Sequence, residues 1–340
     1  MKLKRYSLYS GAHKRHTKVA KIGAFALPIL VMIFAAFYFW PHRGQNEQAT
    51  APQISNLSPA EDAVTLLRQN EENVQSSYDF STIALPTQGA AAIGTLEHGV
   101  LHSDDRVNTP LPMASIAKVV TALAILKKSP IAPGTQGDRI ALSLQDEQYY
   151  NDYFALGGTI TAVADGQSMS QYEALQAMLL ASSNNMADTL VDYYFESKEE
   201  YLEYANAMLK NMGLEQTVVA DTTGFSPQSV STASELVKLG QEALNNSVVA
   251  QIVAMPEATI AVAGTIPNYN VLISEPEVTG IKAGNTDEAG LCLLFSANIE
   301  SATGDSVTVI GVVLGIEEWQ DYQLATITML DGARQAVSSQ

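Results

Sequence analysis

The order in which strand-like and helix-like patterns follow one another constrains the fold of this chain more than any other feature of its sequence. Runs that are rich in Val, Ile and Leu, or that alternate in polarity, predict strands at residues 258–263, 278–283, 289–299 and 306–314, and a hairpin of two short strands at 90–103 that turns near residues 97–99. Between about residues 170 and 245 the apolar positions recur at helical spacing instead, and a closing helix is expected at 317–337. Strands from both ends of the chain must then meet in one sheet with helices between them, so the sequence predicts an α+β fold.

Capping boxes mark where the helices of the middle segment are expected to begin. Each pairs Ser or Thr with a Glu three residues later, at Ser170 and Glu173, Ser197 and Glu200, and Thr232 and Glu235. Another helix is expected from Ser115 to Lys127, because the string SIAKVVTALAILK repeats apolar residues at helical spacing. Ser115 would therefore lie at the start of a buried helix.

An uncharged, mostly apolar run at residues 22–40 separates a basic N-terminal segment from an acidic remainder of the chain. Eight of the 19 basic residues and none of the 36 acidic ones lie in residues 1–43, which leaves a net charge of −25 on the remainder. As a helix, the run would span about 28 Å, close to the thickness of the hydrocarbon core of a bilayer. The basic residues before it place the N-terminus in the cytoplasm, so the chain beyond residue 40 would be extracellular or periplasmic. A cleaved signal peptide is the alternative.

These features predict four parts of the chain: a cytoplasmic tail at 1–21, a transmembrane anchor at 22–40, a stalk with a short helix at 41–87, and a folded domain at 88–340. The predominantly helical part of that domain is expected at about 140–245.

Composition removes several classes of site. The acidic remainder argues against a nucleic-acid partner, because phosphate binding requires clustered Lys and Arg. A single cysteine, Cys292, excludes an internal disulfide and a cysteine-rich metal site, and its apolar surroundings predict a small buried residue. His98 and His102 are the only histidines after residue 42, and we expect them to be solvated on a hairpin. A Ser-His-Asp triad or a multi-His metal site is therefore not expected.

With histidine scarce, lysine is the candidate base for a nucleophile. Ser115 and Lys118 are three residues apart, which on a helix places the hydroxyl and the amine on one face within reach of each other. A lysine amine acts as a base only when it is neutral for part of the time, and burial achieves this by lowering its pKa. The backbone N–H groups of the same helix start would face an oxyanion beside Ser115.

Two further motifs follow along the chain. Ser183-Asn184-Asn185 lies between two helical stretches, where a simple helix N-cap is the alternative interpretation. Lys282-Ala283-Gly284 enters a pair of strands. The glycine there would let a ligand backbone approach the strand edge, and the lysine would supply a cation.

In this order, S-x-x-K, S-x-N and K-x-G resemble the signature of penicillin-recognising serine enzymes. With the strings LPMASIAKVVTALAIL, LLASSNNMADTL, STASELVKLGQEAL and GIKAGNTDEAGLCLLFSA, the chain resembles the D-alanyl-D-alanine carboxypeptidases over about residues 88–316. These are the low-molecular-mass penicillin-binding proteins of serine peptidase family S11. The resemblance implies a β-lactamase/DD-peptidase-like fold, with an antiparallel sheet flanked by helices and an all-helical subdomain. It implies no metal and no cofactor.

The resemblance also implies catalytic roles for three residues. Ser115 would attack the carbonyl of the penultimate D-alanine in a peptidoglycan stem peptide that ends in D-Ala-D-Ala. Lys118 would take the proton of Ser115, and Ser183 would pass a proton to the leaving D-alanine. β-Lactam antibiotics would acylate the same serine, because they resemble the substrate terminus.

Substrate-binding roles are implied for Asn185, Lys282, Gly284, Asn285 and Thr286. Asn185 would hold the substrate amide and help orient Lys118, and Lys282 would place positive charge near the terminal carboxylate. The N–H groups of Ser115 and Asn285 would form the oxyanion hole. Thr286 provides a further hydroxyl next to the third motif.

One position departs from the family pattern and keeps other functions open. Ala283 stands where the family has Thr or Ser, whose hydroxyl donates to the substrate carboxylate. A wall-binding protein that has lost turnover is therefore one alternative. A β-lactamase is a second alternative, but the E-x-x-L-N pattern of class A enzymes is matched only by Glu242-Ala-Leu-Asn245, which is one residue short. Carboxypeptidase, endopeptidase and transpeptidase activities share one acyl-enzyme and are not separated by the motifs.

Overall fold

The centre of the molecule is a five-stranded antiparallel sheet, and a computed structural model describes the chain from residue 78 to residue 339. The strand order is β2-β1-β11-β10-β9. The strands are β1 (Ala90–Thr95), β2 (Gly99–Ser103), β9 (Val278–Thr286), β10 (Gly290–Glu300) and β11 (Ser306–Ile316). Because Ala90 of β1 pairs with Leu314 of β11, strands from both ends of the domain meet side by side, which confirms the α+β prediction.

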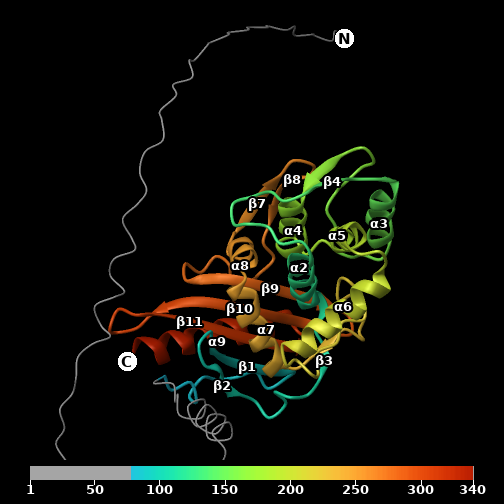
Figure 1. Cartoon of the computed structure of the whole chain (residues 1–340). Coiled ribbons are helices and arrows are strands. Elements are labelled where there is room, and N and C mark those ends of the chain that lie inside the picture. The colour runs from blue at the N-terminus through green and yellow to red at the C-terminus, as the bar shows by residue number, and fades with distance from the viewer. Residues whose placement is uncertain (1–77, 340) are drawn as a thin grey trace, which may run out of the picture. The chain divides into compact units, whose positions relative to one another are not determined.

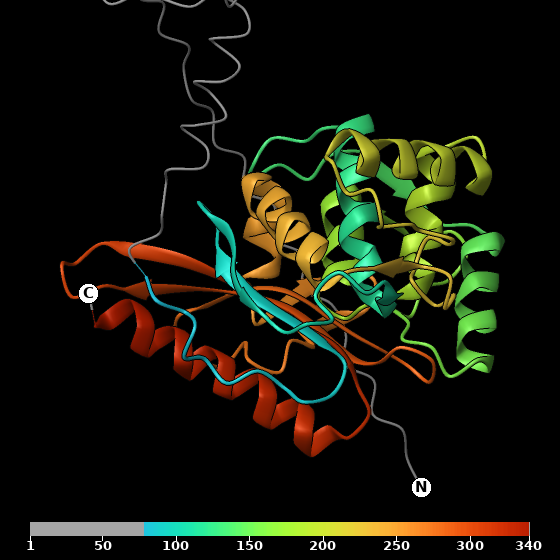
Figure 2. The ribbon, with the colours of Figure 1, turned by 90° about the horizontal axis from the view of Figure 1, so that it is seen from below.

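Helices cover both faces of this sheet. On one face, α9 (Trp319–Ser338) packs against β10 and β11, and on the other face α7 (Ala233–Asn245) and α8 (Ser247–Val253) lie over the strands (Figure 2). Each face has its own apolar core. A strand buried on both sides reads as a continuous apolar run, and β1 (AAAIGT) is buried at every position.

The remaining helices gather beyond α7 and α8, on that same side of the sheet (Figure 1). They are α2 (Ala117–Lys128), α3 (Leu144–Ala155), α4 (Gln171–Leu179), α5 (Asn184–Tyr194) and α6 (Lys198–Asn211). Three two-stranded pairs join this helical part: β3 (Leu111–Pro112) with β6 (Val230–Ser231), β4 (Arg139–Ala141) with β5 (Ser168–Ser170), and β7 (Glu257–Ile260) with β8 (Gly264–Pro267).

The helix starts follow the capping signals, with one difference in detail. Ser170 and Glu173 form the complete reciprocal box at the start of α4. Ser197 and Thr232 also accept from the backbone N–H three residues later, at the starts of α6 and α7. Their Glu partners turn elsewhere, however, because Glu200 pairs with Lys128 and Glu235 accepts from the segment before β6.

Some elements lie outside the sequence predictions. α3 lies inside the helical part expected at about 140–245 but was not predicted as a separate helix, and α8 and β8 were not predicted. The packed unit also includes residues upstream of 88, because Phe80 and Ile83 are buried in the core on the α9 side of the sheet.

The predicted tail, anchor and most of the stalk lie outside the described residues. Among residues 78–339, no helix is long and apolar enough to cross a bilayer.

Candidate active site

The first motif brings a hydroxyl and an amine into direct contact. Ser115 lies in a single 3₁₀ turn, Ala114–Ile116, which leads into α2, so the nucleophile candidate lies one turn before the α-helix proper. Lys118 lies in the first turn of α2 and is completely buried. Its Nζ donates a hydrogen bond of 2.8 Å to Ser115 Oγ.

Burial makes Lys118 suited to act as a base. Desolvation lowers the pKa of its amine to about 7, against the opposing pull of the Asp221 and Asp188 carboxylates. The Nζ also donates to the backbone carbonyl of Thr223 at 2.8 Å, which fixes its position. Near neutral pH, a large fraction of this amine is therefore unprotonated and able to take a proton.

Two glycines allow other segments to approach the Ser115 turn. Gly224 has a positive φ, and a Cβ there would lie 1.9 Å from the Ala114 carbonyl oxygen. A Cβ on Gly284 of β9 would lie 3.0 Å from the Ser115 nitrogen. The glycine of the third motif therefore makes room for the turn that carries Ser115. Ala114 itself has a φ of 46°, an uncommon conformation that is held by this packing.

The second motif lies at the start of α5. Ser183 occupies the N-cap position but does not cap the helix; its Oγ donates instead to Asn185 Oδ1 at 2.7 Å. The Asn185 side chain is held on both sides by the backbone of Thr161, at 3.0 Å and 2.9 Å. Both residues are fully buried, and the structure ties Asn185 to Thr161 rather than to Lys118. Ser182, directly before the motif, has a φ of 58°.

The third motif runs along the edge strand β9. Lys282 is 2% exposed, and its Nζ donates to the Ala283 carbonyl at 2.9 Å. Burial, followed by the proximity of Lys118, lowers the pKa of Lys282 well below its usual value. Asn285 is exposed at the end of the strand, and Thr286 Oγ1 accepts from the Ala289 N–H in the turn after it.

A cleft of about 600 Å³ opens above these motifs. The predicted residues that line it are Ser115, Gly284, Asn285 and Thr286, and Ala283 lines it too. Lys118, Ser183, Asn185 and Lys282 lie beneath this lining and are not part of it.

Sequence reasoning missed most of the walls of the cleft. Asn184, the middle residue of the second motif, lines the cleft, whereas the residues on both sides of it that match the motif do not. Four large exposed apolar or aromatic side chains line it as well: Leu156, Phe225, Tyr269 and Trp319. No local pattern marks these four residues, except that Tyr269 lies in the NYN string before the third motif.

The histidines and the cysteine lie apart from the cleft. His98 contacts Thr95 Oγ1 at 3.1 Å and His102 contacts the Ile83 carbonyl at 3.1 Å, so both are half-buried rather than solvated. Cys292 is fully buried, as expected, and burial raises the pKa of its thiol to about 12.

Comparison with known proteins extends the match well beyond the motifs. A family model described as D-alanyl-D-alanine carboxypeptidase, Peptidase_S11, matches residues 89–318. A D-alanyl-D-alanine endopeptidase of Pseudomonas aeruginosa is 29% identical over 198 residues, which are 56% of this chain and 60% of that protein. D-alanyl-D-alanine carboxypeptidase DacF of Bacillus subtilis is 25% identical over 233 residues, 66% of this chain and 57% of that protein. The chain thus spans about three fifths of the length of these relatives.

Solved structures share the fold. A Streptomyces DD-transpeptidase superimposes with a TM-score of 0.63 at 21% identity, covering 74% of this chain and 98% of that one. A D-alanyl-D-alanine carboxypeptidase of Mycobacterium tuberculosis gives a TM-score of 0.61 at 24% identity, covering 76% and 96%. The family model spans both the sheet and the helical part and contains all three motifs, and on this ground the chain belongs to the D-alanyl-D-alanine carboxypeptidase family, peptidase family S11.

Proposed function

We propose that this protein is a serine peptidase that cleaves the terminal D-Ala-D-Ala bond of peptidoglycan stem peptides. The observation that carries the proposal is the 2.8 Å contact between Ser115 Oγ and the amine of Lys118, whose pKa burial lowers to about 7. An exposed serine hydroxyl does not attack amides, and a neutral amine within hydrogen-bond reach supplies the missing base.

Acylation follows from this geometry. Neutral Lys118 takes the hydroxyl proton as Ser115 Oγ bonds to the carbonyl carbon of the penultimate D-alanine. The resulting oxyanion would be held by the N–H groups of Ser115 and Asn285, which Gly284 allows to come close together. Collapse of this intermediate breaks the amide bond and leaves an ester on Ser115.

Proton return completes the cycle. Ser183 passes the proton from Lys118 to the nitrogen of the leaving D-alanine, for which its hydroxyl must turn from Asn185 Oδ1 toward the cleft. Water then attacks the ester carbon while Lys118 accepts its proton, the bond to Ser115 Oγ breaks, and Lys118 returns the proton to that oxygen as the shortened peptide leaves with a new terminal carboxyl group. Asn185, Asn285 and Thr286 are proposed to hold the peptide, and Lys282 to meet the substrate carboxylate, whose charge would offset the burial that disfavours the charged amine.

We propose carboxypeptidase action as the principal activity and a β-lactam as the second ligand of the same serine. An endopeptidase is the other candidate, which two observations favour. Ala283 lines the cleft without the hydroxyl that would bind a free carboxylate, and the charged side chains that line the cleft, Asp287 and Glu288, are both acidic. A cross-linked peptide without a carboxylate beside the cleaved bond would avoid both features.

Release of D-alanine from diacetyl-Lys-D-Ala-D-Ala tests the proposal. We expect release by the wild type and none by Ser115→Ala, whereas Ser103→Ala on β2, outside the cleft, should behave as wild type. The rate at which the protein cleaves a cross-linked dimer peptide, assayed in parallel, measures its endopeptidase activity. Absence of cleavage of both peptides, with no penicillin bound, would identify a wall-binding protein instead. Nitrocefin hydrolysis at many turnovers per second would identify a β-lactamase.

We also propose that residues 22–40 anchor the protein in the cell membrane, with residues 88–340 as the catalytic domain outside the cell. The support is the uncharged 19-residue run with seven basic residues before it. The full chain should remain in the membrane pellet after a carbonate wash, and a chain that begins at residue 44 should not. Recovery of the full chain in the supernatant would contradict the anchor.

A further inference from the structure

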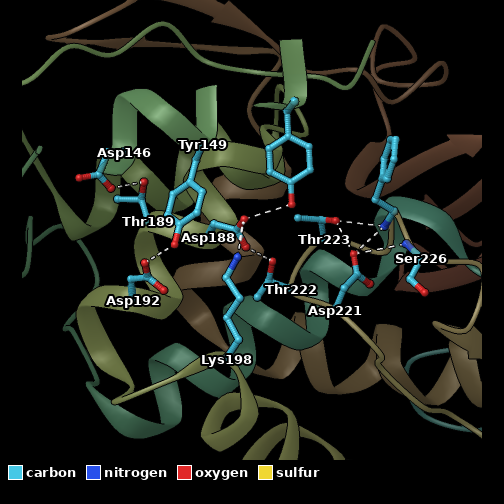
Figure 3. Close-up of polar contacts among 12 residues, drawn as sticks. Asp146, Tyr149, Asp188, Thr189, Asp192, Lys198, Asp221, Thr222, Thr223 and Ser226 are labelled. Atoms are coloured by element: carbon cyan, nitrogen blue, oxygen red, sulfur yellow. Dashed lines mark hydrogen bonds and ion pairs between the residues drawn. The ribbon is translucent and has the colours of Figure 1, made fainter. Parts of the chain in front are cut away.

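A chain of polar contacts leads from the surface of the helical part to Lys118. Lys198, the first residue of α6, forms an ion pair of 2.9 Å with Asp188 of α5. Asp188 also accepts from Thr222 Oγ1 at 2.5 Å and from Tyr153 OH at 3.1 Å (Figure 3). Thr222 directly precedes Thr223, whose carbonyl holds the Lys118 amine.

Asp188 is an unusual residue to find beside a base that must be neutral. Its side chain is 3% exposed, so water screens its charge poorly. It favours the protonated form of Lys118, as Asp221 does. Asp221, however, is engaged by several donors of its own segment, including the N–H groups of Gly224 and Phe225.

Lys198 lies where its positive charge can weaken the attraction between the Asp188 carboxylate and protonated Lys118. Within residues 78–339 it is the only cation in ion-pair contact with that carboxylate, and its side chain is 41% exposed beside a hollow of about 410 Å³. Its Nζ also lies 4.6 Å from the centre of the Tyr149 ring. Figure 3 shows the Lys198 amine reaching Asp188, with the Tyr149 ring beside them.

We propose that Lys198 is a positioning residue for acylation: by pairing with Asp188 it limits the pull of that carboxylate on Lys118 and keeps the amine available as a base. This inference rests on the proposed function of Ser115 and Lys118. Thr222 and Tyr153 donate to Asp188 independently of Lys198, so the carboxylate keeps these two hydrogen bonds when Lys198 is replaced.

The other titratable groups around this pair come from one strand, three helices and the segment before β6. They are Lys282 on β9, Asp221 before β6, Tyr149 and Tyr153 on α3, Asp192 on α5, and Tyr201 on α6, with Asp146 on α3 adjoining Tyr149. Burial raises the pKa of Tyr149, Tyr153 and Tyr201, so all three stay neutral near pH 7. Within the described residues, none of these groups forms an ion pair with Asp188 as Lys198 does.

Two substitutions are expected to shift the pH profile in opposite directions. The measurement is the second-order rate of Ser115 acylation by penicillin between pH 5 and 9. The acidic limb of this profile is the range in which the rate falls as the pH is lowered. Lys198→Met should move the midpoint of the acidic limb to a pH higher by about 0.5–1 unit, because Asp188 then stabilises protonated Lys118 more strongly. Asp188→Asn should move it downward, because an attracting charge is removed. Lys198→Arg retains the cation and should restore the wild-type limb.

The chain offers a matched control on α2, the helix that carries Lys118. Lys128 pairs with Glu200 of α6 at 2.5 Å and lies 4.4 Å from the centre of the Phe195 ring, so it makes the same two kinds of contact at the far end of that helix. Lys128→Met should leave the limb unchanged. If the wild type is not acylated at any pH, the proposed function fails. If it is acylated and Lys198→Met keeps the wild-type limb, or Lys198→Arg shifts it as far as Met does, the inference about Lys198 is wrong.

If Asp188→Asn does not fold, as judged by thermal denaturation, the comparison of Lys198→Met with Lys198→Arg is sufficient to test the inference about Lys198. A purely structural role of the ion pair would lower the acylation rate equally at all pH values without moving the limb, and that result would also overturn the inference.

Discussion

At the scale of single residues, the proposed catalysis depends on a lysine whose burial disfavours its charged form. Lys118 lies at 0% exposure with two hydrogen-bond acceptors for its amine, and no carboxylate of residues 78–339 forms an ion pair with it. Desolvation therefore outweighs the distant carboxylates in setting its pKa. The same residue on the helix surface would remain protonated and could not activate Ser115.

The pH dependence of acylation follows from this pKa. The neutral amine is the active form, so the acylation rate should fall about tenfold per pH unit well below pH 7 and level off above it. The rate of penicillin binding to Ser115, measured from pH 5 to pH 9, checks this. A rate that stays constant from pH 5 to pH 8 would show that Lys118 is not the base.

Ala283 gives a second prediction at this scale. Ala283→Thr should restore a hydroxyl to the cleft wall and add a hydrogen bond to the substrate carboxylate, worth roughly 1.5–3 kcal/mol. That corresponds to a gain of about tenfold to a hundredfold in kcat/KM for diacetyl-Lys-D-Ala-D-Ala. The matched control is the same peptide with a C-terminal amide, for which no gain is expected. An equal gain for both peptides would contradict carboxylate binding at this position.

At the scale of elements, the site depends on how closely β9 approaches the 3₁₀ turn that carries Ser115. The approach requires residue 284 to lack a side chain. Gly284→Ala should displace the Ser115 nitrogen by a few tenths of an ångström and slow acylation at least about tenfold, since the oxyanion donors depend on that position. Thermal denaturation should show a folded protein. Wild-type acylation by this variant would show that the turn tolerates the shift.

Some elements could be predicted because a local sequence pattern marks them, and others could not because they have no such pattern. The sheet strands were predictable because β10 and β11 are apolar along most of their length, as strands buried on both faces are. Helix α3 was not, because its polar string buries only Asp146 and shows no apolar stripe. The spacing of Ser115 and Lys118 predicted that their side chains are within reach of each other, and the order of the three motifs indicated the family.

The residues that line the cleft and the contact between Lys198 and Asp188 could not be predicted from the sequence and became visible only in the structure. Phe225 and Trp319 lie 94 residues apart in sequence and line one cleft only because the fold brings their segments to it. The pairing of Lys198 with Asp188 joins two helices, and a charged residue at a helix start is by itself ordinary. Tertiary packing, rather than any local pattern, decides these contacts.

At the scale of the whole molecule, two buried lysines impose a cost on folding. The pKa values of Lys118 and Lys282 are both lowered in the folded protein, so the unfolded chain binds more protons from about pH 7 up to near 10. Stability therefore rises with pH in that window, by up to about 1.4 kcal/mol per pH unit for each lysine.

Thermal denaturation from pH 7 to pH 9 measures this effect, with about 2–4 °C in Tm expected for each kcal/mol in a domain of this size. Lys118→Met should show a smaller rise than the wild type, because one of the two groups no longer titrates. A wild-type Tm that falls over this range would contradict the lowered pKa values.

The central claim is that Ser115 is a nucleophile activated by Lys118 in a cleft that admits acyl-D-Ala-D-Ala and its penicillin mimics. Mass spectrometry of the protein after incubation with benzylpenicillin tests it most directly, followed by proteolysis to locate the adduct. We expect one penicilloyl group, on the peptide that contains Ser115, and none on Ser115→Ala or Lys118→Met at neutral pH. An unmodified wild-type protein, or an adduct on any other residue, would contradict the claim.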